Sequence, residues 1–430
     1  GINTMSGAVR LSSFIKSNGS KIPIAAIGTY VQALPKKCLE DEPSIDFVFC
    51  NEAVYSLWSV LSLNPIDINH LENVKGIAWR QNGGVIMNPP EKVVPTERMD
   101  LDMPGYAWGL LPYYKKPLDI YKCPAWHSSY KMENRSPYAS LQTSLSCAHR
   151  CNFCVISMIN RDDNEEIGVA GNYAKMRFWS PEFIIKEFDK LVEMGISNIR
   201  IIDELHMHNP KYYKPLHKML IERGYGNIIN CWAYGRIDNF FRDSDSLDNA
   251  KKAGINWIAL GIESFDKDIR CEVSKGKFQD VNIRDVVKKI ENSGIEVMSN
   301  YIFGLPNETA QSIERTKEEA IKLCTLGMNI YPAINLIWSQ LYKDAVEQGI
   351  ELPKSYTGYS FHSYDCIPNR TKDLTAAQIL KYRDDFYNEY HSNPVFLDKV
   401  EKKFGKKAAE DTKKMASVKI RRKLVEEAGL

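Results

Sequence analysis

The sequence predicts an α/β protein: a partial (β/α)6 barrel, preceded by a truncated Rossmann-like α/β domain and followed by a helical C-terminal extension. Short apolar runs alternate with amphipathic segments from residue 139 onward, which is typical of successive β/α units. The first hundred residues show a similar but shorter alternation. The length of 430 residues is enough for two or three domains with a sizeable core.

The barrel is expected within residues 139–350. Ser180 followed by Pro181 is typical of a helix N-terminus, and glycines such as Gly195 end helices just before a strand. Six repeats in series imply a parallel sheet whose functional residues lie at the C-terminal ends of the strands. Strands are predicted near 140–146, 198–203, 228–234, 256–262, 295–303 and 328–336, and helices near 181–195, 210–223, 244–253, 279–293, 309–325 and 340–348.

Residues 1–88 are expected to form the partial α/β domain. Apolar runs at 22–27 and 45–49 suit short buried strands, and the Gln81–Gly84 segment predicts a hairpin. The chain starts with Gly rather than Met, and residues 1–6 are expected to be the end of a strand, so that earlier elements of the domain would be missing.

Two further segments complete the predicted organisation. Residues 89–138 are rich in proline and aromatic residues, and we expect an irregular linker that packs on the rest of the molecule. Residues 351–430 are expected to be a helical extension. Their basic run at 419–423 is interpreted as a solvated helix face, because acidic residues are interspersed nearby.

Composition excludes several classes of function. The net charge of +2 favours neither nucleic acid nor an anionic membrane as a partner. No apolar stretch reaches the roughly 18 residues that a membrane span needs, and no signal peptide is visible. Seven of the ten cysteines are scattered and three lie close together. This usage indicates a reducing compartment, the cytoplasm, and a metal site.

The three clustered cysteines have the spacing C-x3-C-x2-C, at Cys147, Cys151 and Cys154. Three thiolates can hold three irons of a [4Fe–4S] cluster and leave the fourth iron open, as a catalytic metal requires. The alternative is a zinc site closed by His149 or by a remote residue such as His127. It is disfavoured because closed zinc sites usually pair two short ligand motifs.

This motif, with Phe153 before its last cysteine and a place after the first barrel strand, resembles the radical S-adenosylmethionine (SAM) superfamily. The resemblance implies that SAM chelates the open iron and that Phe153 helps to bind the cofactors. It also implies an external electron donor of the flavodoxin or ferredoxin type. One electron then cleaves SAM into a 5′-deoxyadenosyl radical, and the protein orients the cofactors.

Polar residues at predicted strand ends are candidates for binding SAM. The resemblance places the SAM amino group at Asp203 and Glu204, and a bidentate Arg236 could grip its carboxylate. The alternatives are solvated acids at a helix entry and a buried structural pair of Arg236 with Asp238. His206, which follows the acids, is expected at the surface of that helix entry.

The next two strand ends complete the expected SAM site. Glu263 and Ser264 end the fourth strand, where the resemblance places the ribose hydroxyls. Asn300 and Gly304 belong to the fifth strand and its turn, where the resemblance places the adenine. A plain strand-to-helix turn at Gly304 is the alternative.

The front domain resembles the later part of a cobalamin-binding domain. The run Ile24 to Thr29 stands where that family has a strand ending in Gly-Gly, so Gly28, Thr29 and also Ser6 are expected to contact cobalamin. No Asp-x-His-x-x-Gly motif occurs, so no histidine is assigned to cobalt. The alternative is a degenerate α/β lid that binds no cobalamin.

The whole chain therefore resembles the cobalamin-dependent radical SAM enzymes, which include class B methyltransferases and the anaerobic magnesium-protoporphyrin monomethyl ester cyclase. The leading hypothesis is methyl transfer to an unactivated carbon of a small organic molecule. A radical oxidoreductase or cyclase of the porphyrin type is the second hypothesis, and a non-catalytic metal-binding scaffold is the third. No side chain is assigned a catalytic role from the sequence.

Overall fold

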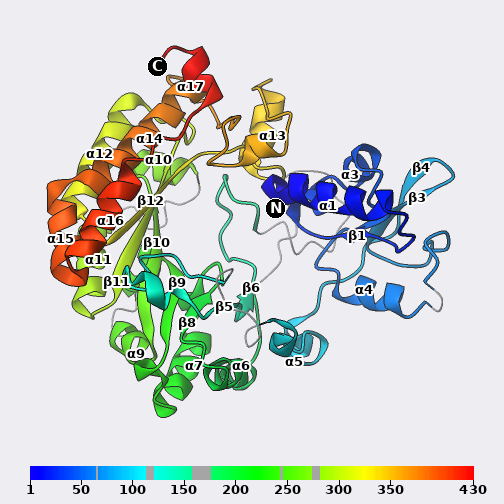
Figure 1. Cartoon of the computed structure of the whole chain (residues 1–430), viewed down its shortest axis with the longest axis horizontal. Coiled ribbons are helices and arrows are strands. Elements are labelled where there is room, and N and C mark those ends of the chain that lie inside the picture. Colours follow the sequence, from blue (N-terminus) through cyan, green and yellow to red (C-terminus); the bar gives the residue numbers. More distant parts are fainter. Residues whose placement is uncertain (64–65, 113–120, 157–175, 243–245, 274–280) are drawn as a thin grey trace.

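A computed structural model of the chain describes residues 1–63, 66–112, 121–156, 176–242, 246–273 and 281–430. A small α/β unit lies beside a larger barrel-like body, and the C-terminal helices pack on the far side of that body (Figure 1). Among the described helices, none is long and apolar enough to cross a membrane.

The main sheet has six parallel strands, and their spatial order β12-β11-β10-β9-β8-β5 follows the sequence. The sheet curls into a half-barrel with helices on its outer side (Figure 1), as the alternation of strands and helices predicts. The strands are β5 (Tyr138–Leu141), β8 (Asn198–Ile201), β9 (Asn230–Arg236), β10 (Ile255–Glu263), β11 (Glu296–Phe303) and β12 (Gly327–Pro332).

The helices between these strands lie close to the predicted positions. The hydroxyl of Ser180 accepts a hydrogen bond from the backbone N–H of Phe183 and caps α6, and Thr309 caps α12 in the same way. The helices are α6 (Pro181–Glu193), α7 (Pro210–Glu222), α8 (Ile237–Arg242), α9 (Ser246–Lys252), α10 (Lys267–Glu272), α11 (Ile283–Asn292), α12 (Ala310–Leu323) and α13 (Gln340–Glu347).

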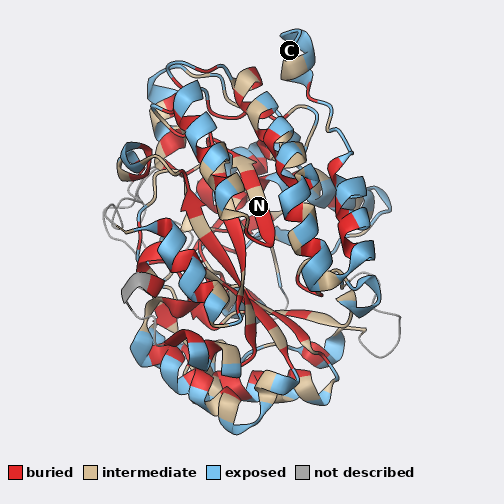
Figure 2. Ribbon diagram, turned by 90° about the vertical axis from the view of Figure 1, so that its left-hand side faces the viewer, coloured by how far each residue is buried: buried red, intermediate tan, exposed pale blue. Residues whose placement is uncertain are grey.

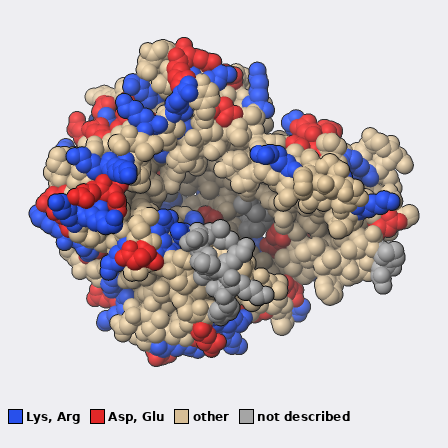
Figure 3. All heavy atoms as spheres, in the orientation of Figure 1, with Lys and Arg blue, Asp and Glu red and all other residues tan. Residues whose placement is uncertain are grey.

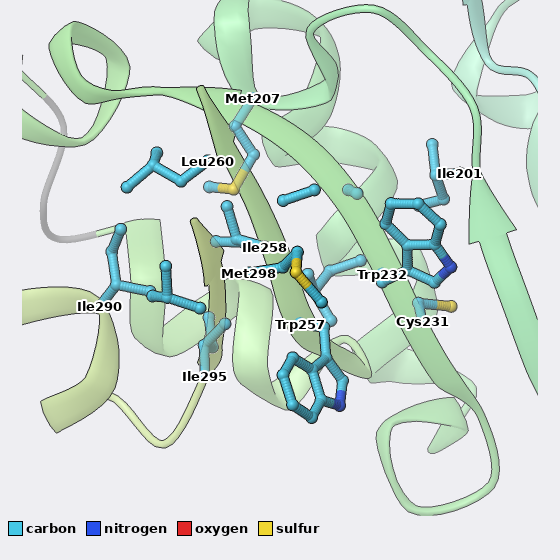
Figure 4. Packing of buried hydrophobic residues seen from close by; sticks show 14 of the residues in the cluster. Ile201, Met207, Cys231, Trp232, Trp257, Ile258, Leu260, Ile290, Ile295 and Met298 are labelled. Atoms are coloured by element: carbon cyan, nitrogen blue, oxygen red, sulfur yellow. The ribbon is translucent and has the colours of Figure 1, made fainter. Parts of the chain in front are cut away.

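Side-chain alternation along the strands separates a helix-covered face from the barrel interior. On β11, Ser299, Tyr301 and Phe303 are buried, whereas Asn300 and Ile302 are half-buried. Apolar side chains from β9, β10 and β11 pack together with Ile290 and Ile295 (Figure 4). Buried residues accordingly concentrate on the strands, and exposed ones lie on the outer sides of the helices (Figure 2).

The first barrel strand is shorter than predicted. β5 ends at Leu141, and a separate strand, β6 (Ser144–Leu145), pairs antiparallel with β7 (Arg177–Phe178). The chain therefore leaves the main sheet before it reaches the cysteines. Hydrogen bonds to Asp203, described below, account for this departure.

The front domain contains a four-stranded sheet in the order β1-β2-β3-β4, in which only the first pair is parallel. The predicted hairpin forms at β3 and β4. The elements are the 3-10 turn η1 (Ile2–Thr4), α1 (Met5–Ser17), β1 (Ala25–Ala26), α2 (Thr29–Ala33), α3 (Pro35–Asp41), β2 (Phe47–Phe49), α4 (Val54–Leu61), β3 (Ile77–Gln81) and β4 (Gly84–Met87).

The start of the front domain is helical, so the prediction of a strand end at residues 1–6 is wrong. The hydroxyl of Thr4 donates to the carbonyl oxygen of Gly1 at 2.7 Å and closes the turn η1. Helix α1 continues directly from it, with Met5 buried and Val9 packed against the domain core. Apolar residues four positions apart favour a helix here over a strand.

The linker packs on the barrel, as its aromatic content predicts. The ring of Trp126 lies 5.0 Å from those of both Trp232 and Trp257, which stand near the starts of β9 and β10. Nε2 of the buried His127 hydrogen-bonds to the carbonyl oxygen of Asn230 at 2.7 Å. The linker thus closes the amino end of the barrel. Its helical turns are η2 (Thr96–Arg98), α5 (Met99–Asp102), η3 (Trp108–Leu110) and η4 (Met132–Arg135).

The C-terminal extension is helical, as predicted. Lys419, Arg421 and Lys423 of its basic run are exposed, as expected of a solvated segment, and Arg421 pairs with Glu426 at 2.7 Å. Arg422 differs from that expectation: it is buried and binds both carboxylate oxygens of Asp384, at 2.8 and 3.0 Å. The helices are α14 (Ala376–Ser392), α15 (Pro394–Phe404), α16 (Lys406–Ala416) and α17 (Lys423–Glu427), preceded by the turn η9 (Thr357–Tyr359).

A buried ion pair joins the front domain to the barrel body. Nη2 of Arg177, on β7, lies 2.7 Å from Oε2 of Glu52, and both side chains are less than a tenth exposed. The backbone of Val94 bonds to both partners. An apolar cluster also joins the two parts, with the rings of Tyr30 and Tyr356 5.1 Å apart.

The substitution Glu52→Gln should destabilise the molecule. It leaves the charge of Arg177 buried without a carboxylate, which costs about 3–5 kcal/mol. We expect a clearly lower melting temperature and faster proteolysis of the front domain. The exposed pair Asp398–Lys402 supplies the control, since Asp398→Asn should change stability by about 0.5 kcal/mol or less. Equal effects of the two substitutions would contradict the assigned role.

Candidate functional site

The cysteine motif forms a loop at the C-terminal end of the sheet. Cys147 is buried, and Cys151 and Cys154 are half-buried. The backbone N–H of Cys154 donates to the carbonyl oxygen of Cys151 at 3.0 Å and closes a tight turn. Asn152 connects this turn to the barrel, because its backbone bonds to Val273 at 3.3 Å and to Leu341 at 3.0 Å.

Asp203 anchors the segment that leads into this loop. One carboxylate oxygen accepts the backbone N–H groups of Thr143 and Ser144, at 2.5 and 3.0 Å. The other accepts the Thr143 hydroxyl and lies 3.3 Å from Nδ1 of His206. Asp203 is fully buried. These bonds draw the chain out of the barrel sheet after β5 and use both oxygens of the carboxylate.

Arg236 lies between the sheet and the cysteine loop. Its Nε donates to Asp238 at 2.9 Å, and its Nη1 lies 3.8 Å from Sγ of Cys151. Although burial alone raises the pKa of Asp238, the charge and hydrogen bond of Arg236 outweigh it, and this pKa is lowered. The structural pair that the sequence left open is present, and the same arginine places a positive charge beside a cysteine.

The cysteines suit a cluster better than a single zinc ion. Among the described residues, no three His, Cys, Asp or Glu side chains converge on a point that could hold one ion. In a cubane, three cysteines bind three different irons, so their sulfurs need not converge. His127, a proposed fourth zinc ligand, lies at the opposite end of the barrel. The residues present therefore fit an iron–sulfur cluster.

Burial keeps the thiol of Cys154 protonated until metal binds. It raises the pKa of the Cys154 thiol to about 12, and the charges of Cys151, Glu204 and Cys147 add to the effect. A cluster must therefore displace the proton of this thiol when it binds.

Glu204 is the member of the acidic pair that remains available. Burial raises its pKa to about 7, and the neighbouring Asp203 adds to this shift, whereas Arg200 opposes it. The carboxyl group thus changes charge near neutral pH. The expectation that His206 lies at the surface is wrong: it is buried, and its Nε2 lies 3.1 Å from Nε2 of His217.

Of the two residues expected at the ribose, Ser264 is part of the scaffold. It is fully buried, and its hydroxyl hydrogen-bonds to Thr316 at 3.2 Å and accepts the N–H of Asp266 at 3.1 Å. Glu263 sits at a register shift of β10 with a φ of +66°, in the left-handed region that non-glycine residues rarely adopt. Strained backbone of this kind is common at functional sites, and Glu263 stands at the C-terminal end of β10, at the barrel mouth.

The residues expected at the adenine have structural partners. Nδ2 of Asn300 donates to the carbonyl oxygens of Leu260 and Met298 at 3.3 and 3.0 Å. Gly304 has a φ of +91°, and a Cβ there would lie 3.0 Å from Ile379 of α14. The glycine is thus required for helix packing. Phe153 packs beside a small apolar cluster that includes Leu305.

The front-domain residues that were expected to contact cobalamin lie in different structural elements. Ser6 is in the first turn of α1, and Thr29 begins α2. Gly28 has a φ of +134°, and a Cβ there would meet nothing within 4 Å. A cavity of about 220 Å³ lies beside them, and it joins Thr29 to Val155, the residue after Cys154. The molecule is visibly hollowed between the barrel and the front domain (Figure 3).

Two buried acids were not recognised as scaffold residues from the sequence. Asp203 was read as a ligand-binding group. Glu308, after the turn at Gly304, is fully buried and accepts the N–H of Gly304 at 2.7 Å. Burial raises its pKa to about 8, against the lowering effect of its backbone hydrogen bonds. Arg200 also escaped notice, although a lone charge inside the apolar run 199–202 is a signal in itself.

Comparison with known proteins identifies the class of this site. Residues 141–320 match the family model of the Radical SAM superfamily. The chain is 23% identical, over 92% of its length and 78% of the relative's, to an uncharacterized methyltransferase of Pyrococcus horikoshii. It is also 23% identical, over 67% of its length and 43% of the relative's, to the anaerobic magnesium-protoporphyrin IX monomethyl ester cyclase of Cereibacter sphaeroides.

The fold is similar to that of a solved structure, the radical SAM methyltransferase TsrM of Kitasatospora setae with cobalamin and a [4Fe–4S] cluster bound. The TM-score is 0.60 at 15% identity, over 82% of this chain and 62% of that one. The agreement confirms a partial barrel with a front α/β domain. The chain spans 62% of that neighbour and 43% of the cyclase.

Removal of the Asp203 anchor should weaken cluster binding. In Asp203→Ala, the N–H groups of Thr143 and Ser144 lose their acceptor, at a cost of about 1–3 kcal/mol each. We expect iron and sulfide per chain after anaerobic reconstitution to fall to less than half of the wild-type values. Asp189→Ala, at a partly exposed carboxylate on α6, should leave both unchanged. A normal iron content in Asp203→Ala would disprove the anchoring role.

Glu308 should make stability depend on pH. Its pKa is about 8 in the folded chain against an ordinary 4.5, so the folded state holds a proton that the unfolded state loses. Stability should therefore fall between about pH 4.5 and pH 8. Glu308→Gln mimics the protonated acid and should be more stable than wild type at pH 8, by a few kcal/mol, but similar at pH 4.5. Urea denaturation at both pH values tests this; a constant difference would contradict it.

Proposed function

Because the chain carries a radical SAM domain over residues 141–320, we propose that it is a cobalamin-dependent methyltransferase that acts on an unactivated carbon of a small organic molecule. The observation that carries this proposal is the position of the front domain. The cavity that joins Thr29 to Val155 sets the carboxyl end of β1 next to the cysteine loop. In α/β sheets, ligands bind at the carboxyl ends of strands, so a cofactor on this domain would face the cluster site.

We assign the cluster to Cys147, Cys151 and Cys154. When bound, the cluster supplies one electron that cleaves SAM to methionine and the 5′-deoxyadenosyl radical, which takes a hydrogen atom from the substrate. Arg236 donates a hydrogen bond to Cys151 and brings a positive charge that favours the anionic cluster. Its commitment to Asp238 argues for this positioning role over a grip on the SAM carboxylate.

Within the acidic pair, Glu204 is the residue we assign to the SAM amino group, because Asp203 already uses both of its oxygens. Glu263 is assigned to the ribose hydroxyls, since it ends β10 at the C-terminal edge of the sheet. Asn300 and Phe153 are kept as neighbours of SAM. The roles of Ser264 and Gly304 are proposed to be indirect, through the packing of the turns that carry them.

For the front domain, we propose that cobalamin lies along β1 and that Gly28 lets it approach the backbone. The open space around the Gly28 Cβ position supports this placement, and Thr29 lines the neighbouring cavity. Ser6, in the first turn of α1, is kept as a further candidate contact. If bound there, cobalamin would supply the transferred methyl group, with a second SAM molecule as its source.

A radical cyclase or oxidoreductase is the second candidate, favoured by the similarity to the magnesium-protoporphyrin cyclase over 67% of the chain. In that reaction no methyl group reaches the product. The electron donor for either reaction is proposed to be an external flavodoxin or ferredoxin, in the cytoplasm, where the ten cysteines of the chain would remain reduced.

The two candidates predict different products from SAM. Methyl transfer consumes two SAM molecules and two electrons, and it yields methylated product, methionine, 5′-deoxyadenosine and S-adenosylhomocysteine. We therefore expect 5′-deoxyadenosine and S-adenosylhomocysteine in equal amounts when the chain is reconstituted anaerobically with iron, sulfide and cobalamin and incubated with SAM, reductant and a methyl acceptor. Mass spectrometry of the products measures both.

Two outcomes would contradict radical methyl transfer. Formation of 5′-deoxyadenosine without S-adenosylhomocysteine would favour the cyclase type, and S-adenosylhomocysteine alone would exclude a radical step. The triple variant Cys147→Ser/Cys151→Ser/Cys154→Ser is the control, because it should lose the cluster and form no 5′-deoxyadenosine.

A further inference from the structure

Arg200 is a charged residue on the interior face of the half-barrel. It belongs to β8, where its neighbours Ile199 and Ile201 are buried under the helices and Arg200 alone is half-buried. Successive side chains of a strand point to opposite faces, so the guanidinium group of Arg200 points into the lumen.

The guanidinium group has no carboxylate partner among the described residues. Its Nη2 donates to the hydroxyl of Tyr234 at 2.5 Å, and its plane lies over the ring of Trp232, with 4.6 Å to the ring centroid. Its Nε is buried without a hydrogen-bond partner. Glu204 shares the electrostatic environment of Arg200 but forms no ion pair with it in the described part of the chain. Arginine is rarely enclosed without a counter-charge.

The surroundings of Arg200 form the floor of the lumen. Trp232, over which it lies, contacts Trp126 of the linker, which closes the amino end of the barrel. Half-buried polar side chains from other strands face the same space. By the strand register, Ser140 lies level with Arg200 and Tyr138 below it, whereas the others lie nearer the C-terminal ends of their strands: Tyr234, Asn300, Asn329 and Tyr331. The floor of the lumen is thus lined by aromatic side chains, and Arg200 adds a positive charge to it.

The register of the sheet gives the depth of this floor. Arg200 pairs with Trp232, four residues before Arg236, which contacts Cys151. At about 3.3 Å per residue, the two levels are about 13 Å apart. A carboxylate that binds the cluster iron lies near the cysteines. The carboxylate of SAM would therefore lie too far above Arg200 to be its partner.

We propose that Arg200 binds a carboxylate group of the substrate and thereby holds the substrate in the lumen below the SAM site. This inference rests on the proposed function, because it takes the lumen to be a substrate site. The planar fork of arginine matches a carboxylate with two parallel hydrogen bonds. The contact with the Trp232 ring restrains the guanidinium group from one face. It leaves open the edge that would donate hydrogen bonds to a carboxylate. The substrate class is therefore a small organic carboxylate, with an aromatic or apolar body against Tyr234 and Tyr331.

The test is ligand binding to the reconstituted full-length chain with cluster, cobalamin and saturating SAM, so that SAM fills its own site. Fluorine NMR titration follows 4-fluorobenzoate, with 4-fluorobenzamide as the uncharged analogue. We expect the wild type to bind the carboxylate at least tenfold more tightly than the amide. Arg200→Gln should lose at least tenfold in affinity for the carboxylate, and Arg200→Lys should be intermediate. Arg223→Gln, at an exposed arginine after α7, should bind like wild type.

Several results would overturn the proposal. These are failure of the wild type to bind 4-fluorobenzoate, unchanged binding by Arg200→Gln, or tighter Arg200-dependent binding of 4-fluorophenyl phosphate, which would indicate a phosphate. Arg200→Gln should unfold at nearly the wild-type temperature; a large drop would mean that Arg200 serves the fold instead. Carboxylate binding requires no methyl transfer, so this test and the product ratio of the SAM reaction can fail separately.

Discussion

The hydrogen bonds of Asp203 are the constraint on which the geometry of the site depends. A buried carboxylate is stable only when its oxygens are satisfied, and here they are satisfied by the chain just ahead of the cysteine motif. The first barrel strand therefore ends early, and the motif starts from a fixed point at the sheet edge. The second fixed point lies inside the motif, where Asn152 bonds to the ends of other β/α units. A loop held at both points can keep its thiols in place while the chain between them follows the shape of a cluster.

The polar residues of the barrel fall into two groups with different structural roles. One group is committed to the scaffold: Ser264 and Glu308 are fully buried and bonded to turns at the strand ends. The other group includes Arg200, in the lumen, and Glu204, just after β8, and neither forms an ion pair in the described part of the chain. Scaffold groups maintain the shape of the turns, whereas the other groups remain available to ligands. Under the proposed function, the cluster would lie above a lumen that has its own charge.

The front domain contributes by position. A buried ion pair and an apolar cluster hold it against the barrel, and the small cavity beside Thr29 lies between the two parts next to the cysteine loop. Under the proposed function, this arrangement would bring two cofactors together without a flexible arm. The linker and the C-terminal extension are rich in aromatic residues for a separate reason: each covers an apolar face of the barrel.

The sequence by itself determined the order of the elements, the parallel half-barrel and the cysteine cluster motif, because these depend on local signals. Hydrophobic periodicity, caps and the spacing of Cys147, Cys151 and Cys154 are all readable within short windows. Which acid is committed to the scaffold was decided only by the tertiary structure. Asp203 and Glu204 are adjacent and chemically alike, but the first meets Thr143 from another β/α unit and the second does not. In the same way, only the tertiary structure shows that Arg236 contacts Cys151, that His206 is buried and that residues 1–6 are helical. Contacts between segments far apart in the chain decide such roles, and no local pattern contains them.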